Sequence, residues 1–214
     1  MKDRFYLSCL RDNVGGNVAF HGKKGHSYVT DLDLAEVYTR EEAQAKWDRL
    51  RDFDVPISAD HADDSSALRV DMQYIPNKSQ VTDKKESYAA FKKGSYCGND
   101  VYWLVGDTGG ANLDFDLAKK LDYETAIKLN EQYWVVIPYE LANAKKRRTF
   151  SYSLYNARTM TQGAGIKKPE HIKRNSRRKA NPKTAFNCTG CGQRIWSLNP
   201  YEYDFSDPIC SRCE

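Results

Sequence analysis

Short apolar runs of strand length recur through the first 150 residues of the chain. Two of them, 5–10 and 101–105, each come before a Gly-Gly pair, and two more, 53–57 and 133–137, each follow a segment with helical spacing. Runs of this length between turn residues predict β-strands. A Gly-Gly pair suits a hairpin turn because glycine accepts positive φ. The pattern therefore predicts hairpins, each continued by a helix and a further strand.

Helix signals lie between the paired runs. Thr39 is followed three residues later by a glutamate, which is a capping box, and apolar residues then repeat at helical spacing over 43–50. Together these features predict a helix over 40–51. Asp122 is the corresponding cap of a second predicted helix over 123–132.

The region between the two helices carries two further signals. Residues 68–74 alternate strictly between apolar and polar side chains, which predicts a half-buried strand. A short helix is predicted over 83–93, ending at Gly94. Both elements are expected to connect the flanking units.

The two flanking units are related in sequence. Residues 31–43 align without gaps on residues 114–126 and are identical at six of the thirteen positions. The predicted fold class is therefore α+β, with two duplicated hairpin-strand-helix-strand units forming a mixed or antiparallel sheet domain.

Four cysteines, Cys188, Cys191, Cys210 and Cys213, form two CxxC pairs separated by eighteen residues. This spacing is typical of a structural Zn²⁺ site, in which two tight turns supply four thiolates. Two disulfides or a redox pair are the alternatives, although the pairs lie outside the βαβ setting of a thioredoxin-like motif. Four thiolates close the coordination sphere, so the predicted zinc stabilises a small module rather than acting in catalysis.

The expected compartment is the cytoplasm, or the host cytoplasm if the chain comes from a bacteriophage. The apolar run at 5–7 is far shorter than a signal-peptide core. No apolar stretch approaches the roughly 20 residues of a membrane span, so no membrane association is expected. In a reducing compartment the remaining cysteines, Cys9 and Cys97, are expected to be ordinary thiols.

Positive charge is concentrated directly before the cysteine pairs. The net charge is +4, but residues 1–144 hold 18 Lys+Arg against 24 Asp+Glu, and residues 145–183 hold 13 against one. A basic block beside a zinc module is the electrostatic pattern of phosphate binding to DNA or RNA. The alternative is a solvated linker whose charge serves solubility. His21 and His26, which flank a basic hairpin tip, are minor candidates for a surface contact. The predicted nucleic-acid contacts are Lys145, Lys146, Arg147, Arg148, Lys173, Arg174, Arg177, Arg178, Lys179, Arg194, Trp196 and Arg212.

Candidate catalytic chemistry is weak. Both units share an Asp-x-Asp, and on a strand Asp31 and Asp33, or Asp114 and Asp116, would face the same side. A half-buried strand produces the same pattern without a functional site, and residues 60–64 are interpreted as a solvated turn. No set of nucleophile, base and electrophile converges, so an enzyme is less expected than a binding protein.

The cysteine-containing tail resembles the zinc ribbons of transcription and replication proteins, on Cys188-Thr-Gly-Cys191 and Cys210-Ser-Arg-Cys213. The duplicated unit is similar in style to small accessory proteins of bacteriophages. The first resemblance covers about 27 of the 214 residues and implies a four-cysteine zinc ribbon that supports nucleic-acid binding.

The leading functional prediction is a non-enzymatic zinc-ribbon protein. Its basic block would contact DNA or RNA phosphates, and its acidic duplicated domain would contact protein. One alternative is a protein–protein interaction module that inhibits a host or defence complex; a metal-dependent nuclease using the paired aspartates is a further one. The expected domains are a first repeat at 1–58, a connection at 59–98, a second repeat at 99–150, a basic linker at 151–184 and the ribbon at 185–214.

Overall fold

A computed structural model describes most of the chain. The described residues are 3–25, 27–49, 51–82, 87–107, 109–129, 131–177, 183–199, 201–203 and 206–213, without the side chains of 174–177. The chain divides into two compact units, Met1–Pro169 and Glu170–Glu214. Each unit is described by itself.

The first half of the larger unit contains a four-stranded antiparallel sheet with the strand order β3-β2-β1-β4. Short helices and 3-10 turns follow its strands. The elements in chain order are β1 (Phe5–Val14), β2 (Asn17–His21), η1 (Lys23–Gly25), β3 (Tyr28–Val29), η2 (Leu32–Leu34), α1 (Arg40–Trp47), β4 (Asp54–Ser58) and α2 (Ala59–Asp64).

The second half contains another four-stranded antiparallel sheet, with the order β8-β7-β6-β9. This is the same arrangement of a central hairpin, a third strand on one side and a fourth on the other. Its elements are β6 (Tyr88–Cys97), β7 (Asp100–Val105), β8 (Gly110–Asn112), η4 (Phe115–Leu117), α3 (Tyr123–Ala126), β9 (Trp134–Pro138) and α4 (Tyr139–Asn143).

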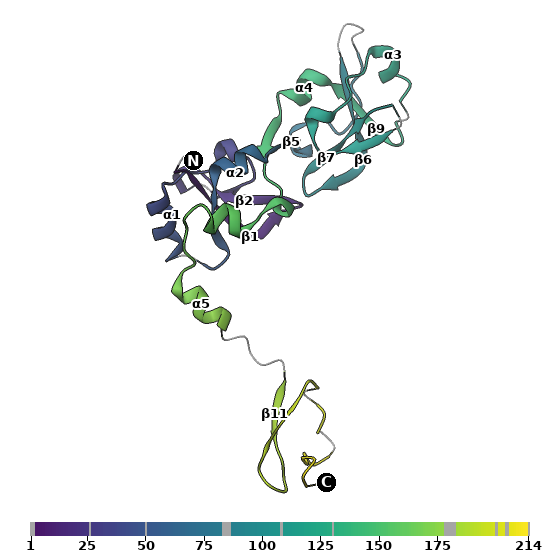
Figure 1. Cartoon of the computed structure of the whole chain (residues 1–214). Helices are drawn as coiled ribbons and strands as arrows, with labels where there is room; N and C mark the ends of the chain where they lie inside the picture. Colours follow the sequence, from purple (N-terminus) through teal and green to yellow (C-terminus); the bar gives the residue numbers. More distant parts are fainter. Residues whose placement is uncertain are drawn as a thin grey trace. The chain divides into compact units, whose positions relative to one another are not determined.

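A strand from each half pairs with one from the other, and this two-stranded sheet links the two four-stranded sheets. β5 (Ala67–Val70) pairs antiparallel with β10 (Lys146–Thr149), and η3 (Met72–Tyr74) and η5 (Tyr152–Leu154) follow them. Figure 1 shows the two four-stranded sheets at opposite ends of this unit, with β5 between them. The fold is therefore α+β, as predicted, with several antiparallel sheets and few helices.

Each of the two paired strands also leads a residue into the hydrophobic core of the opposite half. Phe150, just after β10, is buried with Tyr6 and Phe20 in the core of the first half. Val70, at the end of β5, is buried with Trp103 and Phe115 in the core of the second half. Because each half completes the hydrophobic core of the other, the pairing of β5 with β10 holds the unit together.

Several predicted elements differ from the structure. Residues 88–93, expected to be helical, belong to strand β6, whose first four residues are all buried between β7 and β9. The alanine- and lysine-rich sequence favours a helix locally, but central pairing in a sheet overrides that preference. Residues 83–86 of this predicted helix lie outside the described residues.

Other boundaries are also corrected. The first helix begins at Arg40 as predicted, with the Thr39 capping box present, but it ends at Trp47. The second is a single turn, Tyr123–Ala126. The alternating stretch at 68–74 leaves the strand after Val70, where Asp71 caps the turn η3. Residues 60–64 are helical rather than a solvated turn.

The predicted basic linker also differs over residues 151–169, which belong to the larger unit. A π-helical turn, η6 (Arg158–Gln162), buries Met160 and Thr161, and the Thr161 hydroxyl donates a 2.8 Å hydrogen bond to the carbonyl of Pro56. Ile166 is also buried. These few apolar residues dock the segment on β4 despite its glycine- and lysine-rich sequence.

The hairpin turns of the two halves touch each other at two glycines. Gly15 has φ +60°, and a Cβ atom there would lie 2.4 Å from the backbone nitrogen of Gly98. Gly98 has φ +62°, and its Cβ would lie 2.7 Å from the nitrogen of Gly15. Only glycine permits both this conformation and this approach.

Replacing Gly15 by alanine is therefore expected to destabilise the protein more than the same change at Gly25. Both positions have positive φ, but a Cβ on Gly25 meets nothing within 4 Å. The conformational cost is about 1 kcal/mol at either site, and the steric conflict at Gly15 adds about 1–3 kcal/mol. Urea unfolding of the two variants measures the difference, and equal losses would contradict the close approach.

Candidate metal centre

The first pair of cysteines lies at the tip of a β-hairpin in the smaller unit. β11 (Thr184–Asn187) pairs antiparallel with β12 (Arg194–Ser197). Directly after β11, the amide of Cys188 donates to the carbonyl of Gln193 at 2.9 Å, and the amide of Gly192 donates back to Cys188 at 2.8 Å. These two bonds fold Cys188 and Cys191 into one tight turn.

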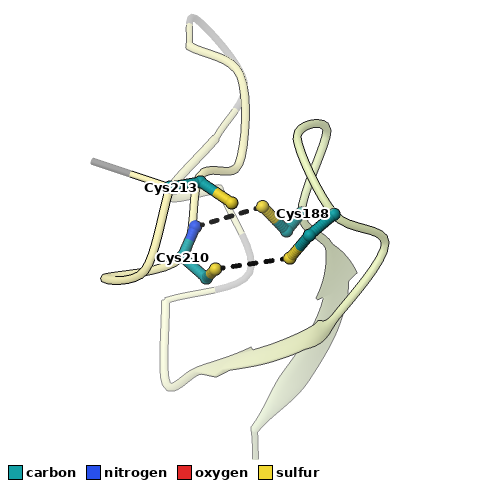
Figure 2. Close-up of side chains that lie close together, drawn as sticks. Cys188, Cys210 and Cys213 are labelled. Carbon is teal, nitrogen blue, oxygen red and sulfur yellow. Dashed lines mark hydrogen bonds between the residues drawn. The ribbon is translucent and has the colours of Figure 1, made fainter.

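The second pair faces the first across the module. The amide of Cys210 donates to the sulfur of Cys188 at 3.3 Å, and the amide of Cys213 donates to the carbonyl of Cys210 at 2.8 Å. The amide of Thr189 donates to the carbonyl of Pro208 at 2.9 Å. Figure 2 shows the side chains of Cys188, Cys210 and Cys213 converging on one point, with the Cys210 amide directed at the Cys188 sulfur.

The four sulfur atoms form a cluster of the size that a metal ion requires. All four lie within 4.8 Å of one another, and the sulfurs of Cys191 and Cys210 are 3.5 Å apart. A tetrahedral Zn–S bond of about 2.3 Å places neighbouring sulfurs about 3.8 Å apart. A disulfide requires about 2.05 Å, and all four thiols are free.

The surroundings shift the pKa values of the thiols in opposite directions. Hydrogen bonds from the backbone amides of Cys210 and Cys191 lower the pKa of Cys188 to about 6. Contacts with the thiols of Cys191, Cys210 and Cys188 raise the pKa of Cys213 to about 12. One thiolate is thus favoured, whereas a full set of four negative charges requires a cation at the centre.

Gly190 lies where a side chain would crowd the second pair of cysteines. A Cβ atom at Gly190 would lie 3.1 Å from the sulfur and 3.2 Å from the Cβ of Cys213. The absence of a side chain lets the first turn approach the second pair of cysteines closely. Cys188 and Cys210 are 3% and 9% exposed, and the other two cysteines are exposed.

These cysteines can hold a metal ion, and the donor set suits zinc, which prefers a tetrahedral thiolate environment. Four protein ligands leave no coordination position for water or substrate. The centre is therefore suited to stabilising the module, which has only 45 residues and too little apolar core to fold readily alone. Among the described residues, this is the only group of metal-ligating side chains close enough to share an ion.

The structure divides the predicted basic block between the two units. Lys145 and Lys146 are exposed on the larger unit. Arg147 is largely buried against Asp100 at 2.7 Å, and Arg148 pairs with Asp33 at 2.8 Å. The last two arginine side chains are thus held by carboxylates within the larger unit.

The other predicted contacts belong to the smaller unit. Lys173 lies in α5 (Glu170–Arg177) and pairs with Glu170 at 2.6 Å. Arg174 and Arg177 lie in the same helix, but their side chains, and residues Arg178 and Lys179 entirely, are outside the described set. The remaining candidates, Arg194, Trp196 and Arg212, are exposed on the ribbon.

The paired aspartates do not lie on strands. Asp31 accepts a hydrogen bond from the amide of Asp33 and caps η2. Asp114 caps η4 through the amide of Asp116 in the same way. The pattern shared by the two halves is thus a turn-capping signal, which explains the first aspartate of each pair.

A polar cluster that sequence reasoning missed lies on the first sheet. The carboxylate of Asp54, in the middle of an apolar run, contacts His21 at 3.2 Å, Arg51 at 2.8 Å and Tyr28 at 3.3 Å. A charged residue inside a run that reads as a buried strand is the available signal, since an isolated buried carboxylate is costly. His21, predicted only as a minor surface contact, is thus part of this cluster, and His26 lies outside the described residues.

No protein-family model, curated protein or solved structure matches the chain. Within the residues that the structure covers, no helix is long and apolar enough to cross a membrane.

Proposed function

We propose that the protein is a non-enzymatic nucleic-acid-binding protein and that its four cysteines bind zinc. The observation that carries the proposal is the surface of the ribbon beside the cysteine cluster. Arg194 and Trp196 lie on the same face of β12, both exposed, with the guanidinium carbon 5.9 Å from the centre of the indole ring. A cation beside an exposed aromatic ring is suited to binding a phosphate and stacking on a base.

The position of these residues supports the same function. Trp196 is 45% exposed, although burying its indole would be more favourable in a module with so small a core. Arg212 is exposed between the second pair of cysteines. A zinc-stapled hairpin would hold these side chains on a rigid support, which reduces the entropy lost on binding.

The larger unit would then provide a scaffold built by duplication. Apart from the turn η1, residues 5–75 and 88–155 contain the same series of strands, helices and turns, and their sheets share one strand order. Thr39 and Asp122 cap α1 and α3 at equivalent places. We infer that the two halves arose from one unit and that the first half, which holds 8 Lys+Arg against 13 Asp+Glu over residues 5–75, contacts protein through its acidic surface.

Replacing Trp196 by alanine is expected to weaken binding of a fluorescent single-stranded oligonucleotide. One stacked base contributes about 1–3 kcal/mol, so the dissociation constant should rise about 5-fold or more. Fluorescence anisotropy at two salt concentrations measures the affinity, which should fall steeply as salt rises because phosphate contacts release counterions.

The matched control is Tyr133→Ala, which removes another exposed aromatic side chain, in this case from the larger unit. It should leave the affinity unchanged. Absence of binding by the unmodified protein at low salt would overturn the proposed function. An equal loss of affinity in both variants would show that the ribbon surface is not the binding surface.

A protein-binding role is favoured by a different observation. Leu34 and Leu117 end the equivalent turns η2 and η4, and both are more than half exposed. Exposed apolar side chains at matching places are suited to protein contact. A partner captured from nuclease-treated lysate by the wild-type chain, and lost with Leu34→Ser, would support this second function.

A further inference from the structure

The first half of the larger unit contains a polar cluster around one buried carboxylate, which its fold does not require. Asp54 is fully buried and faces Cys9 across the β1–β4 pair. The residue at the corresponding place in the second half is Trp134, which faces Lys92 across β6–β9. Likewise, the half-buried His21 follows the four buried residues of β2 at the place where β7 has the buried Leu104.

The second half shows that this position can be filled by hydrocarbon. There Leu104 packs with Tyr88, Ala90 and Val136 in an apolar cluster, with Trp134 against it. A buried aspartate with a histidine and an arginine offers less stabilisation than such packing. The polar set in the first half is therefore better explained by a function than by folding.

The geometry of the cluster fixes the histidine. The carboxylate of Asp54 accepts from Nε2 of His21 at 3.2 Å and from Nε of Arg51 at 2.8 Å. Tyr28 donates its hydroxyl to the same carboxylate at 3.3 Å and packs edge-on against the imidazole. With Nε2–H held by this carboxylate, the imidazolium form of His21 keeps Nδ1–H as a donor for an acceptor oxygen of another partner.

A pocket of about 340 Å³ adjoins this histidine. It is lined by His21, Gly22, Gly25, Ser27, Tyr28, Tyr38 and Lys46. The described lining residues supply an ammonium group, an imidazole and three hydroxyl groups, and none of them is acidic; the adjoining carboxylate of Asp54 is occupied by His21, Arg51 and Tyr28. This composition favours an anion with several acceptor oxygens.

The loop that forms one wall is specific to this half. Residues 22–27 separate β2 from β3, whereas β7 and β8 are separated by residues 106–109. Lys24 within the longer loop has φ +57°, a left-handed conformation uncommon outside glycine. Its amide donates to the carboxylate of Glu36 at 2.8 Å, so a hydrogen bond within this half holds the longer loop in place.

We propose that this pocket binds a phosphate group, with Lys46 supplying the charge and His21, oriented by Asp54, supplying a second contact. Lys46 lies 4.9 Å from the ring centre of Tyr38 and is exposed at the rim, so its ammonium can reach an oxyanion in the pocket. The ligand class is a phosphate monoester, either as a small molecule or as the 5′ end of a nucleic-acid strand.

The test is a set of titrations of the full chain, in which binding is measured from the changes in amide chemical shifts. The ligands are inorganic phosphate, a nucleoside 5′-monophosphate, and a matched pair of oligonucleotides with a 5′-phosphate or a 5′-hydroxyl group. Shifts at His21, Ser27 and Lys46 are expected with inorganic phosphate at millimolar concentration. A response to the monophosphate comparable to that of the 5′-phosphorylated strand would identify a small-molecule site. A preference for the phosphorylated strand over its hydroxyl partner would identify a strand-end site.

Two variants make the result decisive. Lys46→Met should weaken phosphate binding about tenfold, whereas Lys128→Met, which removes an exposed lysine from the second half, should not change it. The Trp196→Ala variant should keep the pocket response, which separates this site from the ribbon function. No shifts with inorganic phosphate, or shifts unchanged by Lys46→Met, would overturn the proposal.

Discussion

Replacing Cys188 by serine is expected to abolish stoichiometric zinc binding and to unfold the smaller unit, while the larger unit stays folded. Cys188 is the most buried of the four cysteines, and its sulfur accepts the amide of Cys210 at 3.3 Å. Its loss therefore removes one metal ligand and the hydrogen bond that joins the two turns. The change lies outside the larger unit, whose core contains none of the four cysteines.

The expected effect is large because metal binding and folding are coupled in so small a module. Structural zinc contributes about 10–16 kcal/mol of apparent binding free energy in zinc-finger peptides at neutral pH. The described part of the ribbon offers little core to replace it: Phe186 packs edge-on against Tyr203 with ring centres 4.8 Å apart, and both are only half-buried. Without metal, the four clustered thiols also lose the cation that permits their joint ionisation.

The measurement combines metal analysis with amide spectra of residues 184–213. The wild-type protein should contain one zinc ion per chain, and the amide signals of these residues should be well dispersed. A strong chelator should remove that dispersion without affecting the signals of the larger unit. Cys97→Ser is the matched control, since Cys97 accepts the Gly16 amide in the larger unit and should leave the zinc content unchanged. Dispersed ribbon signals in metal-free protein would contradict a structural role for the metal.

Features encoded by neighbouring residues can be predicted from the sequence. The Thr39 capping box depends on residues three apart, and both of its reciprocal hydrogen bonds are present. The two CxxC pairs likewise indicate which cysteines converge, because each pair needs only one tight turn. Chemistry that depends on local spacing is visible in a linear chain.

Features that depend on distant pairing cannot be predicted in the same way. The strand β6 includes residues whose local sequence favours a helix, and its partners β7 and β9 decide its conformation. Arg147 belongs to a basic block in the sequence, but its partner Asp100 is 47 residues earlier in the chain. Charge counted along the sequence therefore overstates the cations available to a phosphate backbone.

Replacing Asp100 by alanine is expected to lower the free energy of unfolding of the larger unit by about 3–5 kcal/mol, the cost typical of breaking a buried ion pair. Asp100 is 1% exposed and accepts from Arg147 at 2.7 Å and from the amide group of Asn17 at 2.5 Å. The Arg147 side chain is 12% exposed, so its guanidinium would remain away from water without its main partner. Asp71, at 3.9 Å, would remain as a more distant carboxylate and would offset only part of the loss.

The neighbouring arginine provides the control. Arg148 pairs with Asp33, which is 62% exposed, and with Asp63, which is 22% exposed. Solvent screens the outer pair, and Asp63 still holds Arg148 without it, so Asp33→Ala should cost about 1 kcal/mol or less. Urea unfolding of the two single variants compares a buried with a solvated ion pair one residue apart.

The double variant Asp100→Leu, Arg147→Met tests whether the ion pair stabilises the larger unit or aligns its two halves. Replacing both charges by apolar side chains removes the desolvation cost of the pair but leaves the buried Asn17 amide without its acceptor, so only part of the lost stability should return. The network joins β7 of one half to β10, which pairs with β5 of the other. If its role is to align the halves, the double variant should recover that part of the stability but show altered amide shifts at Gly15 and Gly98. A single Asp100→Ala variant as stable as wild type would contradict the buried pair itself.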